Sequence, residues 1–164
     1  MTQSFSVQYK IKPSQPEAHL YQVSCYIPSP DPAGQIIYMP AWIPGSYMIR
    51  DFAKNIVQIT ASDDKGTVKL EKLDKQTWQC PPCAGPLKLD YEVYAWDLSV
   101  RTAHLDSTHA YYNGSSVFLS VKGKEQKICS IEIQRPDGEQ YADWRVATTL
   151  PRLSAKLYGF GLYQ

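Results

Sequence analysis

Apolar and polar residues alternate most regularly over Leu87–Tyr94. One face of this run is apolar and carries Leu87, Leu89, Tyr91 and Val93, with mostly charged residues on the other. Successive side chains of a β-strand point to opposite faces, so this alternation predicts a strand with one face in the core. Ile128–Gln134 shows a similar pattern and is followed by the turn-forming sequence Arg-Pro-Asp-Gly, which predicts another strand.

Less regular alternation marks several other segments of the chain. They are Ser4–Ile11, Ala18–Tyr26, Ile56–Ala61, Thr67–Leu73, Thr77–Gln79 and Val117–Val121. Prolines separate the first two segments, and a polar run at residues 62–66 separates the third from the fourth, so each pair predicts a β-hairpin. Only Tyr47–Asn55 and Ser154–Tyr158 have room for a helical turn, and neither shows the apolar spacing of an amphipathic helix.

These patterns predict one fold class. Many short strands separated by Pro, Gly and Asp, without alternating helices, favour an all-β fold, an antiparallel β-sandwich with little helix. The length of 164 residues fits a single domain, and no repeat or linker-like stretch divides it. We therefore expect one domain over residues 1–164.

The composition excludes several functional classes. Apolar residues make up 43% of the chain and charged residues 20%, which is enough for a packed core and unlike a disordered chain. The formal net charge of +1 gives no field that would attract nucleic acid or an anionic membrane. No segment is long and apolar enough to cross a bilayer, and the first residues lack a signal-peptide pattern. We therefore expect a cytoplasmic protein without membrane or nucleic-acid partners.

Cys80 and Cys83 form a Cys-Pro-Pro-Cys motif. Such spacing can serve a redox pair or half of a zinc site. Here the motif lies in a turn between two predicted strands instead of at the start of a helix, and the other two cysteines, Cys25 and Cys129, are isolated. A thiol-based redox protein is therefore the weakest hypothesis that we keep.

The three histidines form no recognisable metal motif. A catalytic zinc site often takes two histidines one helical turn apart and a third ligand. His104 and His109 are five residues apart, so in an unbroken strand their side chains would point to opposite faces and could not share an ion. A turn between them, or pairing of His104 with Asp106, is the alternative. We expect no metal site, and we find neither a nucleophile with a flanking base nor a glycine-rich phosphate loop.

Two turn-rich segments carry most of the unusual residues. The first, residues 39–52, contains a Pro-Gly pair that suits the centre of a type II turn. We interpret it as a structural corner in which Trp42 and Tyr47 pack on the sheet, with direct ligand contact as the alternative. Arg50 would pair with Asp51 or a carbonyl. The second segment, residues 97–116, ends in an Asn-Gly turn and suits contact residues or a hydrogen-bonded structural loop equally well.

At these two segments the sequence resembles the glycyl aminopeptidases, zinc metallopeptidases with a β-rich N-terminal domain, a helical zinc-binding domain and a C-terminal PDZ domain. The family's Pro-x-Trp-x-Pro-Gly-Ser-Tyr run leading to Arg-Asp-Phe is present as Pro40, Trp42, Pro44, Gly45, Ser46, Tyr47, Arg50, Asp51 and Phe52. The later pattern, Asp-x-Ser-Val-Arg-Thr followed by an aromatic-Asn-Gly turn, is present as Asp97, Ser99, Val100, Arg101, Thr102, Tyr112, Asn113 and Gly114. The resemblance is to the N-terminal domain only and covers essentially the whole chain.

The resemblance implies that the reaction chemistry lies outside this chain. The family's His-Glu-x-x-His helix and later glutamate ligand would follow Gln164, and zinc there would activate water toward the first peptide bond. We therefore expect a noncatalytic N-terminal domain, cut from a longer zinc-dependent aminopeptidase, that covers one side of the active-site cleft. It would hold no cofactor of its own. Its partners would be the downstream catalytic domain and the peptide substrate, and its exposed docking face predicts self-association.

The analogy with zinc aminopeptidases also suggests where substrate would lie. The residues expected to border the pocket for its first residue are Asp106, His109, Tyr111, Tyr112 and Asn113. The residues expected to form the structural motif are Trp42, Pro44, Gly45, Tyr47, Arg50, Asp51 and Arg101. The alternative function is a free-standing β-sandwich module that binds peptide or carbohydrate on an aromatic platform. That platform would consist of Trp42, Tyr47, Tyr111 and Tyr112.

Overall fold

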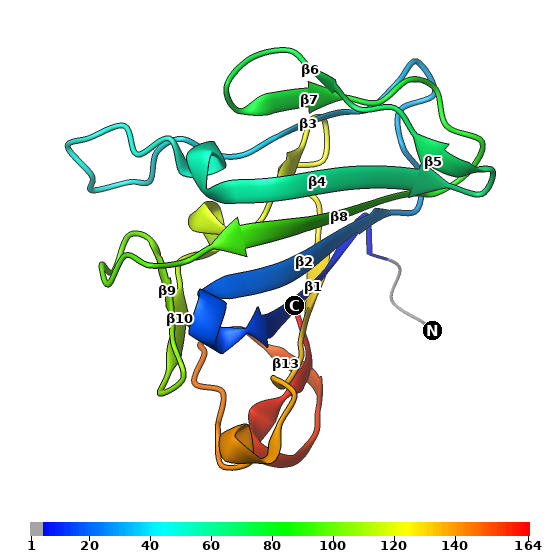
Figure 1. The fold of residues 1–164 in the computed structure, drawn as a ribbon. Helices are drawn as coiled ribbons and strands as arrows, with labels where there is room; N and C mark the ends of the chain where they lie inside the picture. The colour runs from blue at the N-terminus through cyan, green and yellow to red at the C-terminus, as the bar shows by residue number, and fades with distance from the viewer. Residues whose placement is uncertain (1–4) are drawn as a thin grey trace.

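The computed structural model describes residues 5–164 and consists of strands joined by loops and short 3-10 turns (Figure 1). The larger sheet has eight strands in the order β13 (Arg152–Ala155), β14 (Gly161–Tyr163), β12 (Cys129–Ile133), β1 (Val7–Gln15), β2 (Leu20–Ile27), β8 (Leu87–Tyr94), β4 (Ile56–Asp63) and β5 (Gly66–Val68). Its strand pairs are antiparallel, apart from β1 and β12, which run parallel.

Two smaller groups of strands complete the fold. The second sheet has the order β11 (Ser120–Val121), β3 (Ile36–Tyr38), β7 (Thr77–Gln79) and β6 (Glu71–Lys72), and a separate hairpin pairs β9 (Ala103–Leu105) with β10 (Ala110–Tyr112). The 3-10 turns are η1 (Pro16–Ala18), η2 (Phe52–Asn55), η3 (Gly114–Ser116), η4 (Glu139–Tyr141) and η5 (Leu157–Gly159). In Figure 1 the β9–β10 hairpin and the C-terminal segment both extend beyond the same side of the long central strands.

The strand with the clearest alternation, β8, lies in the middle of the larger sheet. It pairs with β2 on one side and β4 on the other. Leu87, Leu89, Tyr91 and Val93 are all buried, as predicted. One cluster of buried apolar side chains includes residues of both sheets, among them Val23 and Leu89 of the larger and Ile37 and Trp78 of the smaller. The predicted all-β sandwich is therefore confirmed.

The predicted hairpins are present, but several short elements differ from the prediction. β1 pairs with β2 across η1, and β4 pairs with β5. Residues 71–72 leave the second hairpin and join the smaller sheet as β6. Of Val117–Val121 only the last two residues form a strand, because the backbone N–H groups of Val117 and Phe118 bond to the Gly114 carbonyl oxygen instead of to a neighbouring strand. The two candidate helical segments hold only η2 and η5, and Ser4 lies outside the described residues.

Within residues 5–164 no helix is long and apolar enough to cross a membrane.

The C-terminal segment of the chain extends the larger sheet by two strands. β14 pairs with β12, and β13 then pairs with β14 at the edge. Phe160 and Tyr163 of this segment are buried, whereas Leu157 is exposed. The apolar C-terminal run therefore packs mainly within the domain.

Candidate functional site

The β9–β10 hairpin carries the polar side chains that the sequence singled out in its second segment. Asp106 organises the turn between the two strands. Its Oδ1 accepts hydrogen bonds from the backbone N–H of Thr108 (2.7 Å) and of His109 (3.0 Å), and from the Thr108 hydroxyl (2.6 Å). An aspartate that bonds to the backbone two residues ahead is a common turn former, so this local sequence folds the chain back on itself.

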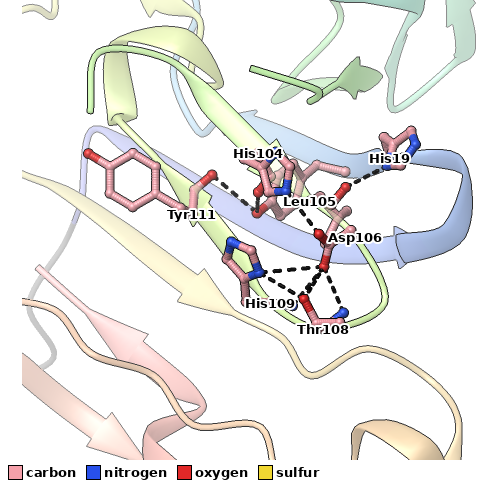
Figure 2. Close-up of polar contacts among 8 residues, drawn as sticks. His19, His104, Leu105, Asp106, Thr108, His109 and Tyr111 are labelled. Atoms are coloured by element: carbon pink, nitrogen blue, oxygen red, sulfur yellow. Dashed lines mark hydrogen bonds and ion pairs between the residues drawn. The ribbon is translucent and has the colours of Figure 1, made fainter. Parts of the chain in front are cut away.

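The same carboxylate also faces two histidines (Figure 2). His104 Nε2 lies 3.0 Å from Asp106 Oδ2, and His109 Nδ1 lies 3.5 Å from Asp106 Oδ1. Donation by the Thr108 hydroxyl, and next by His104, lowers the pKa of Asp106 well below its usual range. Asp106 is therefore ionised at neutral pH. His104 is buried, and its Nδ1 has no hydrogen-bond partner among the described residues.

Aromatic rings stack on both sides of His104. Its ring lies 4.8 Å from that of Trp96 and 4.9 Å from that of His109, at interplanar angles of 29° and 28°. On the far side of Trp96, the His19 ring follows at 3.9 Å. The His19 Nδ1 donates to the Leu105 carbonyl oxygen at 2.7 Å, which ties η1 to the hairpin. The stack fixes the plane of the buried His104 ring.

His104 and His109 therefore lie together, contrary to the prediction from strand alternation. That prediction assumed an unbroken strand from one to the other. The chain instead reverses at Asp106, and the two histidines lie in or beside different strands of one hairpin. The alternative that the sequence left open, a turn between them and a bond from His104 to Asp106, is the observed arrangement.

A groove of about 610 Å³ lies along one side of this hairpin. The wall on the hairpin side includes Thr108, His109, Tyr111 and Tyr112. The opposite wall comes from the C-terminal segment and includes Asp143 and Arg145, which bring one negative and one positive charge. Aromatic side chains supply much of the remaining surface: Tyr21, Phe118, Trp144 and Phe160. Concave sites with apolar walls and a few polar groups are typical of ligand binding.

The predicted pocket-border residues divide into two groups. His109, Tyr111 and Tyr112 line the groove, whereas Asp106 and Asn113 are not part of its wall. Asn113 has a local structural task, because its Oδ1 accepts a hydrogen bond from the backbone N–H of Ser115 (3.1 Å) at the start of η3. The Tyr111 hydroxyl donates to the Val100 carbonyl oxygen at 2.8 Å.

The groove also includes residues that the sequence analysis missed. The segment from Asp143 to Thr148 forms much of the opposite wall. It has no regular alternation and belongs to no strand, so pattern analysis had nothing to detect there. Trp144 in a polar stretch was the one available signal, since a large aromatic side chain among polar residues usually packs on another surface. It packs edge-on against Tyr141.

The Met39–Phe52 segment agrees only in part with its predicted role as a packed corner. The type II turn at Pro44–Gly45 is supported by a φ of 82° at Gly45 and a hydrogen bond from the Ser46 N–H to the Ile43 carbonyl oxygen (3.2 Å). Tyr47, however, does not pack on the sheet, because its side chain is fully exposed.

The polar contacts of this segment also differ from the prediction. Arg50 does not pair with Asp51. Its Nε lies 3.3 Å from the Ser46 hydroxyl, and Asp51 pairs with Lys75 at 2.8 Å. Trp42 is half-exposed and donates through Nε1 to the Ser46 carbonyl oxygen (2.7 Å). The segment is thus anchored in the core by Met39, Ile43 and Phe52, and only its tip around Tyr47 projects into solvent.

The remaining motif residues have structural surroundings. The Thr102 hydroxyl donates to the Asp97 carbonyl oxygen (2.8 Å), and the half-buried Arg101 donates its backbone N–H to the Ser99 hydroxyl (3.3 Å). This part of the second segment is thus a hydrogen-bonded loop. The Cys80 thiol is buried, which raises its pKa to about 12, and burial also raises the pKa of Cys83. Neither thiol is poised to act as a thiolate.

Comparisons with known proteins agree with this architecture. Residues 8–164 match the family model described as the peptidase M61 N-terminal domain. A crystal structure of an aminopeptidase N family protein from Idiomarina loihiensis is similar, with a TM-score of 0.90 and 35% sequence identity. The match covers 96% of this chain and 26% of that protein, so the chain spans about a quarter of its length. Curated protein sequences gave no match.

The family match extends over nearly all of the described residues and includes both turn-rich segments and the groove. It confirms the coarser part of the resemblance noted from the sequence, namely that this is an N-terminal domain of a peptidase. The chain belongs to the peptidase M61 N-terminal domain family.

Proposed function

We propose that this domain forms one wall of the substrate cleft in a longer zinc-dependent aminopeptidase of the glycyl aminopeptidase type. The family match and the aminopeptidase title of the similar structure support this proposal. So do the two sequence strings around Trp42 and Arg101 that resemble that family. In such a protein the zinc-binding domain and the PDZ domain would be separate parts of the chain.

The zinc that carries out the reaction in such an enzyme would be held elsewhere. It would activate water and polarise the peptide carbonyl. This sequence contains no His-Glu-x-x-His run, and its histidine pair lies on a hairpin instead of one face of a helix. The residues present therefore do not fit that zinc site. The task of this domain is to bind and orient substrate and to exclude water.

The groove beside the β9–β10 hairpin is the observation on which the proposal rests. Its aromatic walls suit the apolar parts of a peptide, and Asp143 and Arg145 offer partners for an ammonium group and a carbonyl or carboxylate. Tyr111 is held at the rim by its bond to the Val100 carbonyl oxygen, so its ring is presented to the groove at little entropic cost.

The domain also has a surface suited to the rest of such a protein. The loop that begins at Trp42 exposes Tyr47, Met48 and Ile49 to solvent. Adjacent exposed apolar side chains often mark an interface. We assign this loop to contact with the downstream catalytic domain. The free-standing peptide- or carbohydrate-binding module is less well supported, because none of the described ring contacts joins Trp42 or Tyr47 to Tyr111 or Tyr112.

The test compares two tyrosine variants in a longer peptidase that carries this domain. Tyr111→Ala should raise KM by roughly 2- to 10-fold with little change in kcat, because it removes aromatic contact made equally in ground and transition states. Tyr26→Ala is the matched control, since Tyr26 is similarly exposed but lies outside the groove. Thermal melting should show both variants folded. An unchanged KM for Tyr111→Ala, or an equal rise for Tyr26→Ala, would contradict the proposal.

A further inference from the structure

We propose that His104, Asp106 and His109 bind a divalent transition-metal ion of the zinc type. Their candidate ligand atoms all lie within 4.8 Å of one another. His104 Nε2 and Asp106 Oδ2 are 3.0 Å apart, which suits two ligands that share one ion at bond lengths of about 2.0–2.2 Å. This inference does not depend on the proposed function, because it concerns binding by the chain itself.

The carboxylate of Asp106 is already oriented for such a site. Thr108 and the backbone N–H of His109 supply three hydrogen bonds to Oδ1 and hold the group in one plane. Oδ2 is left facing His104. A ligating carboxylate fixed by neighbouring donors is the arrangement usually found around bound metal ions, since those donors set the direction of the ligand. Thr108 is thus a positioning residue.

The two histidine side chains differ in solvent exposure, and the exposed one leaves the site accessible to an ion. His104 is buried between the rings of Trp96 and His109 and is held in one orientation. The His109 side chain is 50% exposed, so it can rotate toward the other two ligands. In Figure 2 the rings of His104 and His109 both lie beside the Asp106 carboxylate. An ion would enter past the exposed His109 side chain, and water would complete its coordination.

The charge around the cluster also favours a cation. Among the described residues, the ion-pair partners of Asp106 are only the two histidines. No lysine or arginine of residues 5–164 pairs with it. A metal ion at Asp106 would therefore displace no lysine or arginine from the carboxylate.

The ligand types select the class of ion. Two imidazoles and one carboxylate suit zinc and its first-row neighbours, whereas magnesium and calcium prefer oxygen ligands alone. Three protein ligands plus water is the composition of an open zinc site. Binding would join the two strands of the hairpin at its turn, beside the groove that His109 also lines.

The experiment titrates this chain, prepared without a histidine tag, with Zn²⁺ in a calorimeter and with Co²⁺ by visible absorption. The wild-type chain should bind a single ion, with cobalt bands typical of four- or five-coordinate nitrogen and oxygen ligation. His109→Ala should abolish the cobalt bands because it removes one of the three ligands. It should leave the fold intact because this side chain is half-exposed. Thr108→Ala should weaken affinity by roughly 10- to 100-fold, and Thr108→Ser should restore it.

Cys83→Ser is the matched control. Cys83 carries a potential zinc ligand, lies outside the cluster, and is only partly buried, so its replacement should leave the fold intact. It should bind metal like the wild type. Absence of Zn²⁺ and Co²⁺ binding by the wild type, or equal affinity in the wild type and His109→Ala, would overturn the proposal. So would an equal loss in Cys83→Ser. None of these results bears on the groove, because no substrate is present.

Discussion

Tyrosine hydroxyls hold the segment before β11 against the larger sheet. The Tyr91 hydroxyl donates to the Val117 carbonyl oxygen (2.8 Å) and accepts from the Leu119 N–H (3.2 Å). The Tyr9 hydroxyl donates to the Leu119 carbonyl oxygen (2.6 Å). Burial raises the pKa of Tyr91 well above its usual value, so the group stays a neutral donor and acceptor. A segment with little regular structure thereby has its buried backbone groups paired.

Tyr91→Phe should destabilise the domain without changing its shape. The ring would still fill its place, but the Leu119 N–H and the Val117 carbonyl oxygen would lose a buried partner. Leaving buried polar groups unpaired costs roughly 1–3 kcal/mol. Urea unfolding should show this loss in the free energy of unfolding. Tyr94→Phe, at the exposed end of the same strand, is the control and should change it by less than about 0.5 kcal/mol. Equal stabilities for the two variants would contradict this role for the hydroxyl.

Predictions for single residues were most accurate where they followed from the alternation of apolar and polar residues along a strand. The burial of Leu89 and Tyr91 follows from strand geometry alone. The partners of the Tyr91 hydroxyl lie 26 and 28 residues away in the sequence, so the local pattern of residues cannot predict these hydrogen bonds. The exposure of Tyr47 was likewise not predicted, because an aromatic side chain in a loop is expected to pack against its own domain.

At the scale of elements, the long strands were predictable and the short ones were not. β1, β2, β4 and β8 have eight or nine residues, enough for alternation to be recognised. β9 and β10 have three residues each, and their pairing depends on the turn that Asp106 makes. That turn decides whether the two neighbouring histidines meet. The sequence therefore identified the residues of the candidate site but could not predict how they lie relative to one another.

The edge of the larger sheet depends on one glycine. Gly161 in β14 has a φ of 147°, and a Cβ there would lie 2.3 Å from the Ser154 carbonyl oxygen. Gly161→Ala should therefore force β13 away from β14. Amides of Arg152–Ala155 should exchange with solvent at least roughly tenfold faster, with β2 and β8 unaffected.

Gly45→Ala provides a matched comparison for that variant. Its φ of 82° is also unfavourable for alanine, but a Cβ there meets nothing within 4 Å. It should cost roughly 1–2 kcal/mol locally through backbone strain and leave β13 protected. If Gly161→Ala preserved the protection of β13, the close approach between the two strands would not limit this edge.

At the scale of the whole molecule, the domain has two candidate contact surfaces of different chemistry. The groove combines aromatic walls with one acidic and one basic side chain, whereas the loop around Tyr47 is apolar and projects into solvent. A groove suits a small or extended ligand, and a projecting apolar loop suits a protein surface. The sequence strings that resemble the glycyl aminopeptidases mark the loop and the base of the hairpin, but not the opposite wall of the groove.

The apolar loop should make the chain self-associate when its proposed partner is missing. Met48→Ser combined with Ile49→Ser should weaken association by roughly tenfold or more in sedimentation experiments, because both side chains are exposed and can be buried only between molecules. Leu98→Ser with Val100→Ser removes equally exposed apolar groups outside the loop and should have little effect. Chymotrypsin should cleave after Tyr47 in this chain and much more slowly in a longer peptidase, where the docked loop is covered. Monomeric behaviour at every concentration, or equal cleavage in both proteins, would leave the loop without its proposed partner.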